Sequence, residues 1–205
     1  YADAGDRLMD DPSPATRLVL GTAQLGFPHG INNKHGQPTA EEAQGIVAEA
    51  WRCGVVEFDP AQAYGSSEAG LGQALTALDV GGRARVITKL DPALDPADGP
   101  GLDRALRRSL QLLNIPRLAG LMLHHESQLA HWEKGFGRWL GRMREDGLVA
   151  AIGVSTYTPD KALAALDTDG VQFVQIPVNI LDRRFESAGV FRRAQDLGKS
   201  VYIRS

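Results

Sequence analysis

The chain has 205 residues, of which 43% are hydrophobic and 23% are charged, and its formal net charge is −3. This composition indicates one globular domain with a sizeable core. The slight excess of negative charge argues against a nucleic-acid-binding protein, and no apolar run approaches the ~18 residues of a membrane span.

Residues 1–15 contain four aspartates and two prolines without a periodic pattern. We predict an irregular lead-in or linker there, which leaves fusion to or association with another domain open. No signal peptide opens the chain, so we expect a cytoplasmic protein. The single cysteine, Cys53, excludes an internal disulfide and a cysteine-based zinc site, and we predict no metal site. Its place near the end of a helical pattern predicts a small buried residue.

From residue 16 onward, short apolar runs alternate with amphipathic patterns. The predicted strands cover residues 18–20, 55–58, 84–88, 119–123, 149–154, 172–176 and 200–203. The predicted helices cover residues 39–51, 67–78, 102–113, 132–146, 188–197 and a segment that starts near residue 159. The first helix opens with the capping-box spacing of Thr39 and Glu42 and stops at Gly54. Residues 30–36 and 91–101 are predicted loops.

Repeated strand–helix units predict a parallel sheet with right-handed crossovers, either doubly wound or closed as a (β/α)8 TIM barrel. The glycine-rich stretch after the first strand, residues 21–26, lacks the middle glycine of a dinucleotide-binding fingerprint. Polar residues end all the predicted strands, and a barrel would bring them to one mouth. We therefore predict that residues 16–205 form a TIM barrel with about seven βα units. A complete barrel takes about 250 residues, so we expect the natural protein to be longer.

Four of these strand-end residues predict a proton-donating site: Asp59, Tyr64, Lys89 and His124. A tyrosine hydroxyl is a poor proton donor, with a pKa of about 10, unless a nearby cation such as Lys89 lowers this pKa. Asp59 can supply the counter-charge for a lysine in a pocket. His124 can donate a hydrogen bond to the carbonyl oxygen that Tyr64 would protonate, and so orient it. No activated serine or cysteine is evident, so a hydride from a nicotinamide cofactor fits best.

The chain resembles the aldo-keto reductase family, especially bacterial members that open with Gly-Thr-Ala-Gln-Leu-Gly. The matching segments, in order, are residues 20–22, 58–65, 67–72, 88–89, 123–124, 153–155 and 174–175. The resemblance implies a barrel oxidoreductase that reduces an aldehyde or ketone with NAD(P)H and uses Tyr64 as general acid. NADP(H) is the expected cofactor, and NAD(H) stays open. The implied cofactor-binding positions are Gly21, Thr22, Ser155, Thr156, Gln175, Arg204 and Ser205.

Two departures from the family pattern affect this interpretation. Thr156 stands where the family often has an asparagine, and residues 125–126 are His-Glu in place of the Trp-Pro of many members. The segment that binds the adenosine phosphate in the family is not among these 205 residues. A catalytically weak regulatory protein that binds nicotinamide on the same scaffold is therefore the alternative to an enzyme.

Overall fold

The computed structural model describes residues 17–30 and 33–204. The predicted lead-in at residues 1–15 and Ser205 lie outside these described residues. The seven strands are β1 (Val19–Gly21), β2 (Glu57–Asp59), β3 (Arg85–Leu90), β4 (Gly120–Leu123), β5 (Ile152–Ser155), β6 (Phe173–Pro177) and β7 (Ser200–Arg204). They form one sheet in which each strand pairs in parallel with the next strand along the chain. This order confirms the predicted succession of βα units.

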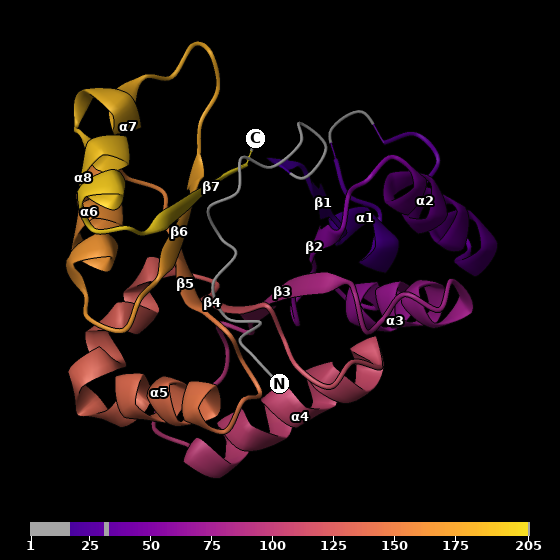
Figure 1. Cartoon of the computed structure of the whole chain (residues 1–205), viewed down its shortest axis with the longest axis horizontal. Coiled ribbons are helices and arrows are strands. Elements are labelled where there is room, and N and C mark those ends of the chain that lie inside the picture. Colours follow the sequence, from indigo (N-terminus) through magenta and orange to yellow (C-terminus); the bar gives the residue numbers. More distant parts are fainter. Residues whose placement is uncertain (1–16, 31–32, 205) are drawn as a thin grey trace, which may run out of the picture.

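Helices connect the strands and cover the outer face of the sheet (Figure 1). The α-helices are α1 (Ala23–Gly26), α2 (Ala40–Arg52), α3 (Ser67–Ala77), α4 (Gly99–Leu113), α5 (Gly137–Glu145), α6 (Pro159–Asp167), α7 (Arg184–Ser187) and α8 (Val190–Asp196). A 3₁₀ helix, η2 (Glu126–His131), and a π-helical turn, η3 (Trp132–Phe136), precede α5. The capping box of Thr39 and Glu42 is present at the start of α2, as the sequence predicts.

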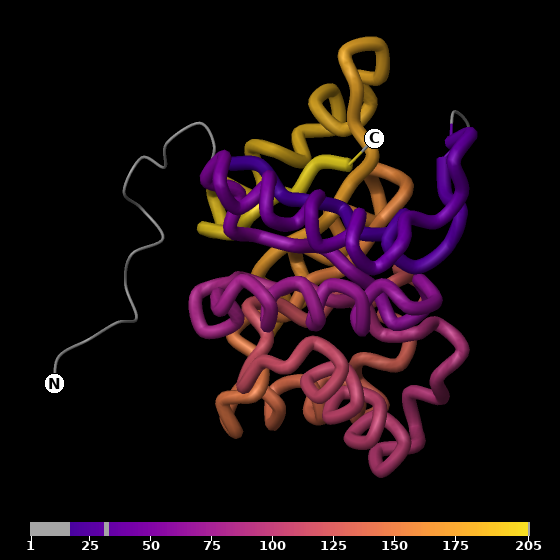
Figure 2. Tube along the Cα trace, turned by 90° about the vertical axis from the view of Figure 1, so that its right-hand side faces the viewer, coloured from indigo at the N-terminus to yellow at the C-terminus, as the bar shows by residue number. Residues whose placement is uncertain are grey.

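The sheet curls so far that strands distant in its order touch across its inner face. Near the carboxyl ends, Gln175 on β6 donates a hydrogen bond of 2.9 Å to Asp59 on β2. Near the amino ends, the Tyr202 hydroxyl on β7 donates one of 2.7 Å to Glu57 on β2. Figures 1 and 2 show the first (indigo) and last (yellow) units approaching each other. The described strands therefore form an open, curled barrel wall, with β1 and β7 as its edges.

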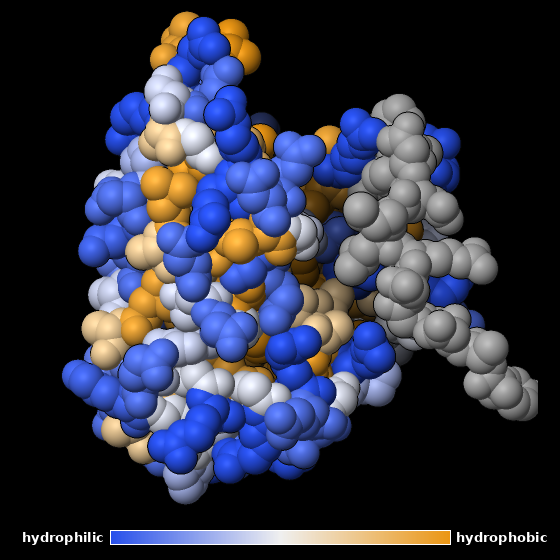
Figure 3. All heavy atoms as spheres, turned by 60° about the vertical axis from the view of Figure 1, so that its left-hand side comes forward, coloured by the Kyte–Doolittle hydropathy of each residue, from blue (hydrophilic) through white to orange (hydrophobic). Residues whose placement is uncertain are grey.

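The main apolar core lies between the sheet and its helices, and a smaller one lies inside the curl. Phe58, Leu71, Leu75, Leu106 and Leu121 are fully buried in the main core. The inner cluster consists of Ile87, Met122 and Phe173. The most exposed apolar side chains, Ile180 and Leu181, lie in the loop after β6 that protrudes at the top of Figures 1 and 3. No helix of the described residues is long and apolar enough to cross a membrane.

Several local predictions are wrong. Cys53 is exposed at the end of α2, where its thiol lies 3.6 Å from a Glu49 carboxylate oxygen instead of in the core. The predicted helix over residues 132–146 is broken, because Gly135 takes a φ of 113° that no α-helix tolerates. The predicted loop over residues 91–101 already contains the first turn of α4, which the Asp98 side chain caps. The helix predicted at 188–197 is confirmed as α8, and the short α7 that precedes it was not predicted.

Candidate active site

The four predicted catalytic residues meet at the carboxyl edge of the sheet. Asp59 ends β2, Lys89 lies in β3, and His124 directly follows β4. Tyr64 lies in the turn between β2 and α3, where its backbone N–H donates to the Ala61 carbonyl oxygen. In parallel strands these ends share one edge, and here the curl also turns them toward one another.

A close backbone contact fixes the turn that carries Tyr64. Gly65 has a φ of +56°, in the left-handed region that favours glycine. A Cβ atom at Gly26 would lie 1.6 Å from the Tyr64 carbonyl oxygen, so only a glycine allows α1 to pack against this turn. The Ser67 hydroxyl then joins α3 to β1, at 2.8 Å from the Thr22 hydroxyl. The glycine pair and the Ser67–Thr22 contact therefore hold Tyr64 in place.

Lys89 and Asp59 form a buried ion pair at the centre of the site. The Lys89 ammonium donates to the Asp59 carboxylate and, at 3.4 Å, to the Pro60 carbonyl oxygen. The lysine side chain is only 2% exposed, whereas Asp59 is 15% exposed. Burial lowers the pKa of Lys89, and the Asp59 charge opposes this change. The carboxylate thus offsets part of the free energy that it costs to bury the ammonium.

The Tyr64 ring lies close to both Lys89 and His124. The Lys89 ammonium is 5.1 Å from the centre of the Tyr64 ring, and the His124 ring meets that ring edge-on at 5.5 Å. Burial lowers the pKa of His124, with a further decrease from the Lys89 charge, so the imidazole is neutral at pH 7. A neutral imidazole can still donate one hydrogen bond to a ligand oxygen.

The predicted direction of the Tyr64 pKa is wrong for this structure. Burial raises the pKa of the Tyr64 hydroxyl above its ordinary value, and the Asp59 charge adds to the rise. The positive charge of Arg204 acts against the rise. Tyr64 therefore holds its proton firmly in the structure described here.

The positions implied for the cofactor follow β1 and β5–β7 along the same edge. Ser155 pairs with Gln175 in the sheet register, and Arg204 pairs with Pro177. Among the described residues, Thr156 Oγ1, Gln175 Oε1 and one Arg204 guanidinium nitrogen are buried without a hydrogen-bond partner. Thr22 differs, because its hydroxyl already contacts Ser67. The carboxyl ends of β5–β7 thus offer one acceptor, one hydroxyl and one cation to a ligand.

Sequence reasoning missed a polar network behind the site. Glu68 is buried between α3, β3 and α4, where the Thr88 hydroxyl donates to it at 2.6 Å and Ser109 at 3.2 Å. Burial raises the pKa of Glu68. Gln62 donates to Ser109 at 2.9 Å and accepts from the Asp91 backbone N–H. One signal was present in the sequence, because Glu68 shares a helical face with the buried Leu71 and Leu75.

Tyr157 was also missed. Its ring lies 4.5 Å from the Arg204 guanidinium, in cation–π contact, and 5.9 Å from the His125 ring. Its backbone N–H donates to the Glu126 carboxylate at 2.8 Å. The ring therefore packs against Arg204 beside the predicted catalytic residues. Tyr157 lies in the loop between β5 and α6, which carries no distinctive motif.

Comparison with known proteins decides the family. The model of the aldo/keto reductase family matches residues 17–205. The chain belongs to this family. Among curated proteins, Protein REDOX 2 of Catharanthus roseus is 28% identical over 153 residues, or 65% of this chain and 47% of that protein. The chain thus spans about half the length of this curated relative.

Solved structures of aldo-keto reductases share the fold. PA4992 from Pseudomonas aeruginosa, described as an aldo-keto reductase, has a TM-score of 0.75 and 25% identity over 91% of this chain and 72% of its own. AKR11C1 from Bacillus halodurans has a TM-score of 0.73 and 21% identity over 92% of this chain and 61% of its own. These neighbours confirm the predicted barrel architecture, of which the described residues form the curled wall.

Proposed function

We propose that the protein reduces an aldehyde or ketone to an alcohol, with Tyr64 as the proton donor and NADP(H) as the preferred cofactor. The observation that carries this proposal is the meeting of Asp59, Tyr64, Lys89 and His124 at one edge of the sheet. Membership of the aldo/keto reductase family supports an oxidoreductase role.

The unpartnered polar atoms at the ends of β5–β7 fit a nicotinamide cofactor. Gln175 and Ser155 would hold the carboxamide, Thr156 would contribute its free hydroxyl, and Arg204 would face a phosphate. Gly21 ends β1, and Thr22 directly follows it. When bound, the nicotinamide supplies a hydride to the carbonyl carbon.

The protein's own residues supply the proton. The Tyr64 hydroxyl, kept protonated by its raised pKa, donates to the carbonyl oxygen as negative charge develops there. The neutral His124 orients the same oxygen by a hydrogen bond. The Lys89 ammonium, held in place by Asp59, stabilises the phenolate that forms on Tyr64. Each residue therefore has a distinct part in one proton transfer.

A two-step measurement on the full-length protein tests this function. Fluorescence titration with NADPH and with NADH first establishes whether a cofactor binds and which one binds more tightly. NADPH oxidation is then followed with a panel of aldehydes and ketones. We expect tighter binding of NADPH and turnover of at least one carbonyl compound. Cofactor binding without any turnover would contradict the proposed reductase and favour a regulatory protein that senses nicotinamide.

A further inference from the structure

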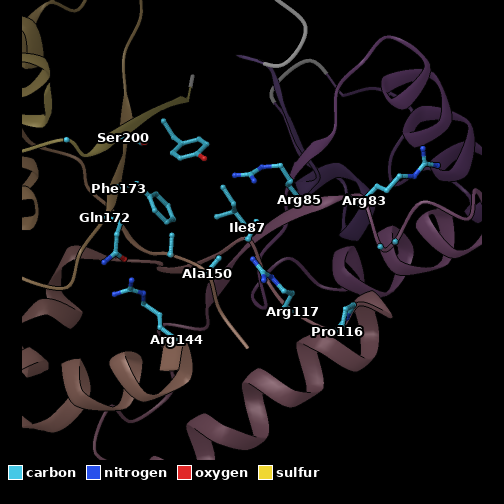
Figure 4. A pocket seen from close by; sticks show the side chains of 17 residues that line it. Arg83, Arg85, Ile87, Pro116, Arg117, Arg144, Ala150, Gln172, Phe173 and Ser200 are labelled. Carbon is cyan, nitrogen blue, oxygen red and sulfur yellow. The ribbon is translucent and has the colours of Figure 1, made fainter. Parts of the chain in front are cut away.

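A cavity lies at the opposite end of the curled sheet from Tyr64. It has a volume of about 760 Å³ and is lined by residues at the amino ends of β3–β7 and by the segments that lead into them. Figure 4 shows these side chains around a shared space. Known small-molecule pockets have about 300–1,000 Å³, so the space suits a ligand of ordinary size.

The cavity is strongly basic although the protein carries a net negative charge. Among the described residues, four arginines line it, namely Arg83, Arg85, Arg117 and Arg144, and no aspartate or glutamate does. Two of them are engaged elsewhere. The Arg83 guanidinium lies 5.3 Å from the centre of the Trp51 ring, and Arg85 lies 3.8 Å from the Glu57 carboxylate.

Arg117 and Arg144 are the two available cations. Neither makes an ion pair with any residue in the described part of the chain. In Figure 4 both side chains extend from the side of α4 and α5, Arg117 toward Ile87 and Arg144 toward Gln172. A planar guanidinium binds a phosphate through two parallel hydrogen bonds, so two of them suit a doubly charged group.

The inner wall of the same cavity is apolar and aromatic. Ala119, Ala151 and Tyr202 line it with partly exposed side chains. Behind them, these three residues pack against the buried cluster of Ile87, Met122 and Phe173. A ligand would thus meet cations at one end and an apolar surface at the other.

We propose that this cavity binds a phosphate ester with a planar apolar body. The phosphate would lie between Arg117 and Arg144, and the body would pack against the wall that Ala119, Ala151 and Tyr202 provide. Nothing in the proposed reaction uses these residues, since the proton-donating set lies at the other edge of the sheet. The cavity is therefore a separate ligand site.

Binding of 1-naphthyl phosphate to the full-length protein tests the proposal. The titration is followed by calorimetry with saturating NADPH present, so that the edge near Tyr64 is occupied. We expect a dissociation constant below about 1 mM, which rises with ionic strength because part of the attraction is between charges. Inorganic phosphate and neutral 1-methoxynaphthalene should each bind at least about tenfold more weakly, since each lacks half of the recognition.

The double variant Arg117→Ala, Arg144→Ala should weaken this binding at least about tenfold. A matched double variant, Arg107→Ala, Arg192→Ala, removes the same charge from exposed positions outside the cavity and should leave the affinity unchanged. Circular dichroism establishes that each variant is folded, and Arg117→Lys, Arg144→Lys repeats the test if the alanine variant is not. Absence of binding to the wild type, or equal weakening in both alanine variants, would overturn the proposal.

Discussion

The two ends of the same curled sheet differ in charge: polar groups are paired or neutral at the carboxyl end, whereas positive charge dominates at the amino end. At the carboxyl edge, the Lys89 charge is matched by Asp59, and burial keeps Tyr64 and His124 neutral at pH 7. At the amino end, arginines surround an open cavity in whose lining residues 17–30 and 33–204 place no carboxylate. Each end also has one hydrogen bond across the barrel to β2.

In the two functions proposed above, this difference separates the reaction from ligand binding. A proton donor works best where its charge state is fixed by burial and where the developing charge meets a held cation. An anion site instead needs uncompensated positive charge that solvent and ligand can reach. The parallel sheet allows both, because the carboxyl and amino ends of its strands lie at opposite ends of the barrel and are joined by different loops.

Loss of the Tyr64 hydroxyl should have the largest effect. Tyr64→Phe removes the proposed proton donor and should lower kcat by about 10²–10⁴-fold, the usual contribution of general acid catalysis. Steady-state NADPH oxidation with the best carbonyl substrate measures this loss. Cofactor affinity, measured by fluorescence titration, serves as the control and should change little. Turnover equal to that of the wild type would exclude Tyr64 as the donor.

The pH dependence of kcat/KM should be a broad plateau, which reports the charge states of the free enzyme. The pKa of His124 lies below its ordinary 6.5 and that of Tyr64 above its ordinary 10.0, so both groups are neutral between these values. We expect kcat/KM to fall about tenfold per pH unit once Tyr64 ionises, at a pH above about 10. A decline that begins near pH 8 would contradict the raised pKa of Tyr64.

The same His124 shift predicts a dependence of stability on pH. Below pH 6.5 the unfolded chain binds a proton at this residue more readily than the folded protein does. The free energy of unfolding should therefore decrease as the pH falls from about 6.5 to 5. His124→Gln, which cannot be protonated, should reduce this slope in urea denaturation curves. An unchanged slope would show that the imidazole is not buried as described.

Gly153→Ala should destabilise the inner wall of the barrel. A Cβ atom at Gly153 would lie 2.1 Å from the Phe173 ring, which has no room to move away without shifting β6. We expect a loss of about 1–3 kcal/mol in the free energy of unfolding, as for other overpacked cores. The control is Gly141→Ala on α5, where a Cβ atom meets nothing within 4 Å and alanine favours the helix. Equal stability of the two variants would contradict this packing.

The smallest effect is expected for the hydrogen bond between Tyr202 and Glu57. Tyr202→Phe removes the hydrogen bond to Glu57 and leaves that carboxylate, which is 8% exposed, with Arg85 at 3.8 Å. The free energy of unfolding should decrease by about 1 kcal/mol, the net value of one such hydrogen bond. Urea denaturation at neutral pH measures it. An unchanged midpoint would mean that the curl does not depend on this contact.

Much of the carboxyl edge could be predicted from the sequence. Asp59, Lys89 and His124 each end a short apolar run, and in a parallel sheet such ends meet by topology alone. The amino-end cavity could not be predicted, because Arg117 and Arg144 lie in separate segments that only the curl of the sheet brings together. The break at Gly135 comes from a single backbone angle, and the exposure of Cys53 from its place after the end of α2. Periodicity encodes neither. The Tyr64 pKa depends on burial, and the sequence shows neighbours but not solvent.

A matched pair of tyrosine variants tests the division between the two ends most directly. Tyr64→Phe and Tyr202→Phe each remove one hydroxyl, the first beside the Lys89–Asp59 pair and the second beside Glu57. Single-turnover oxidation of bound NADPH by a carbonyl substrate is measured for both variants under conditions in which both are folded. We predict a rate at least about 10²-fold below wild type for Tyr64→Phe and a rate within about twofold of wild type for Tyr202→Phe. Equal rates in the two variants would contradict the assignment of the reaction to the carboxyl edge.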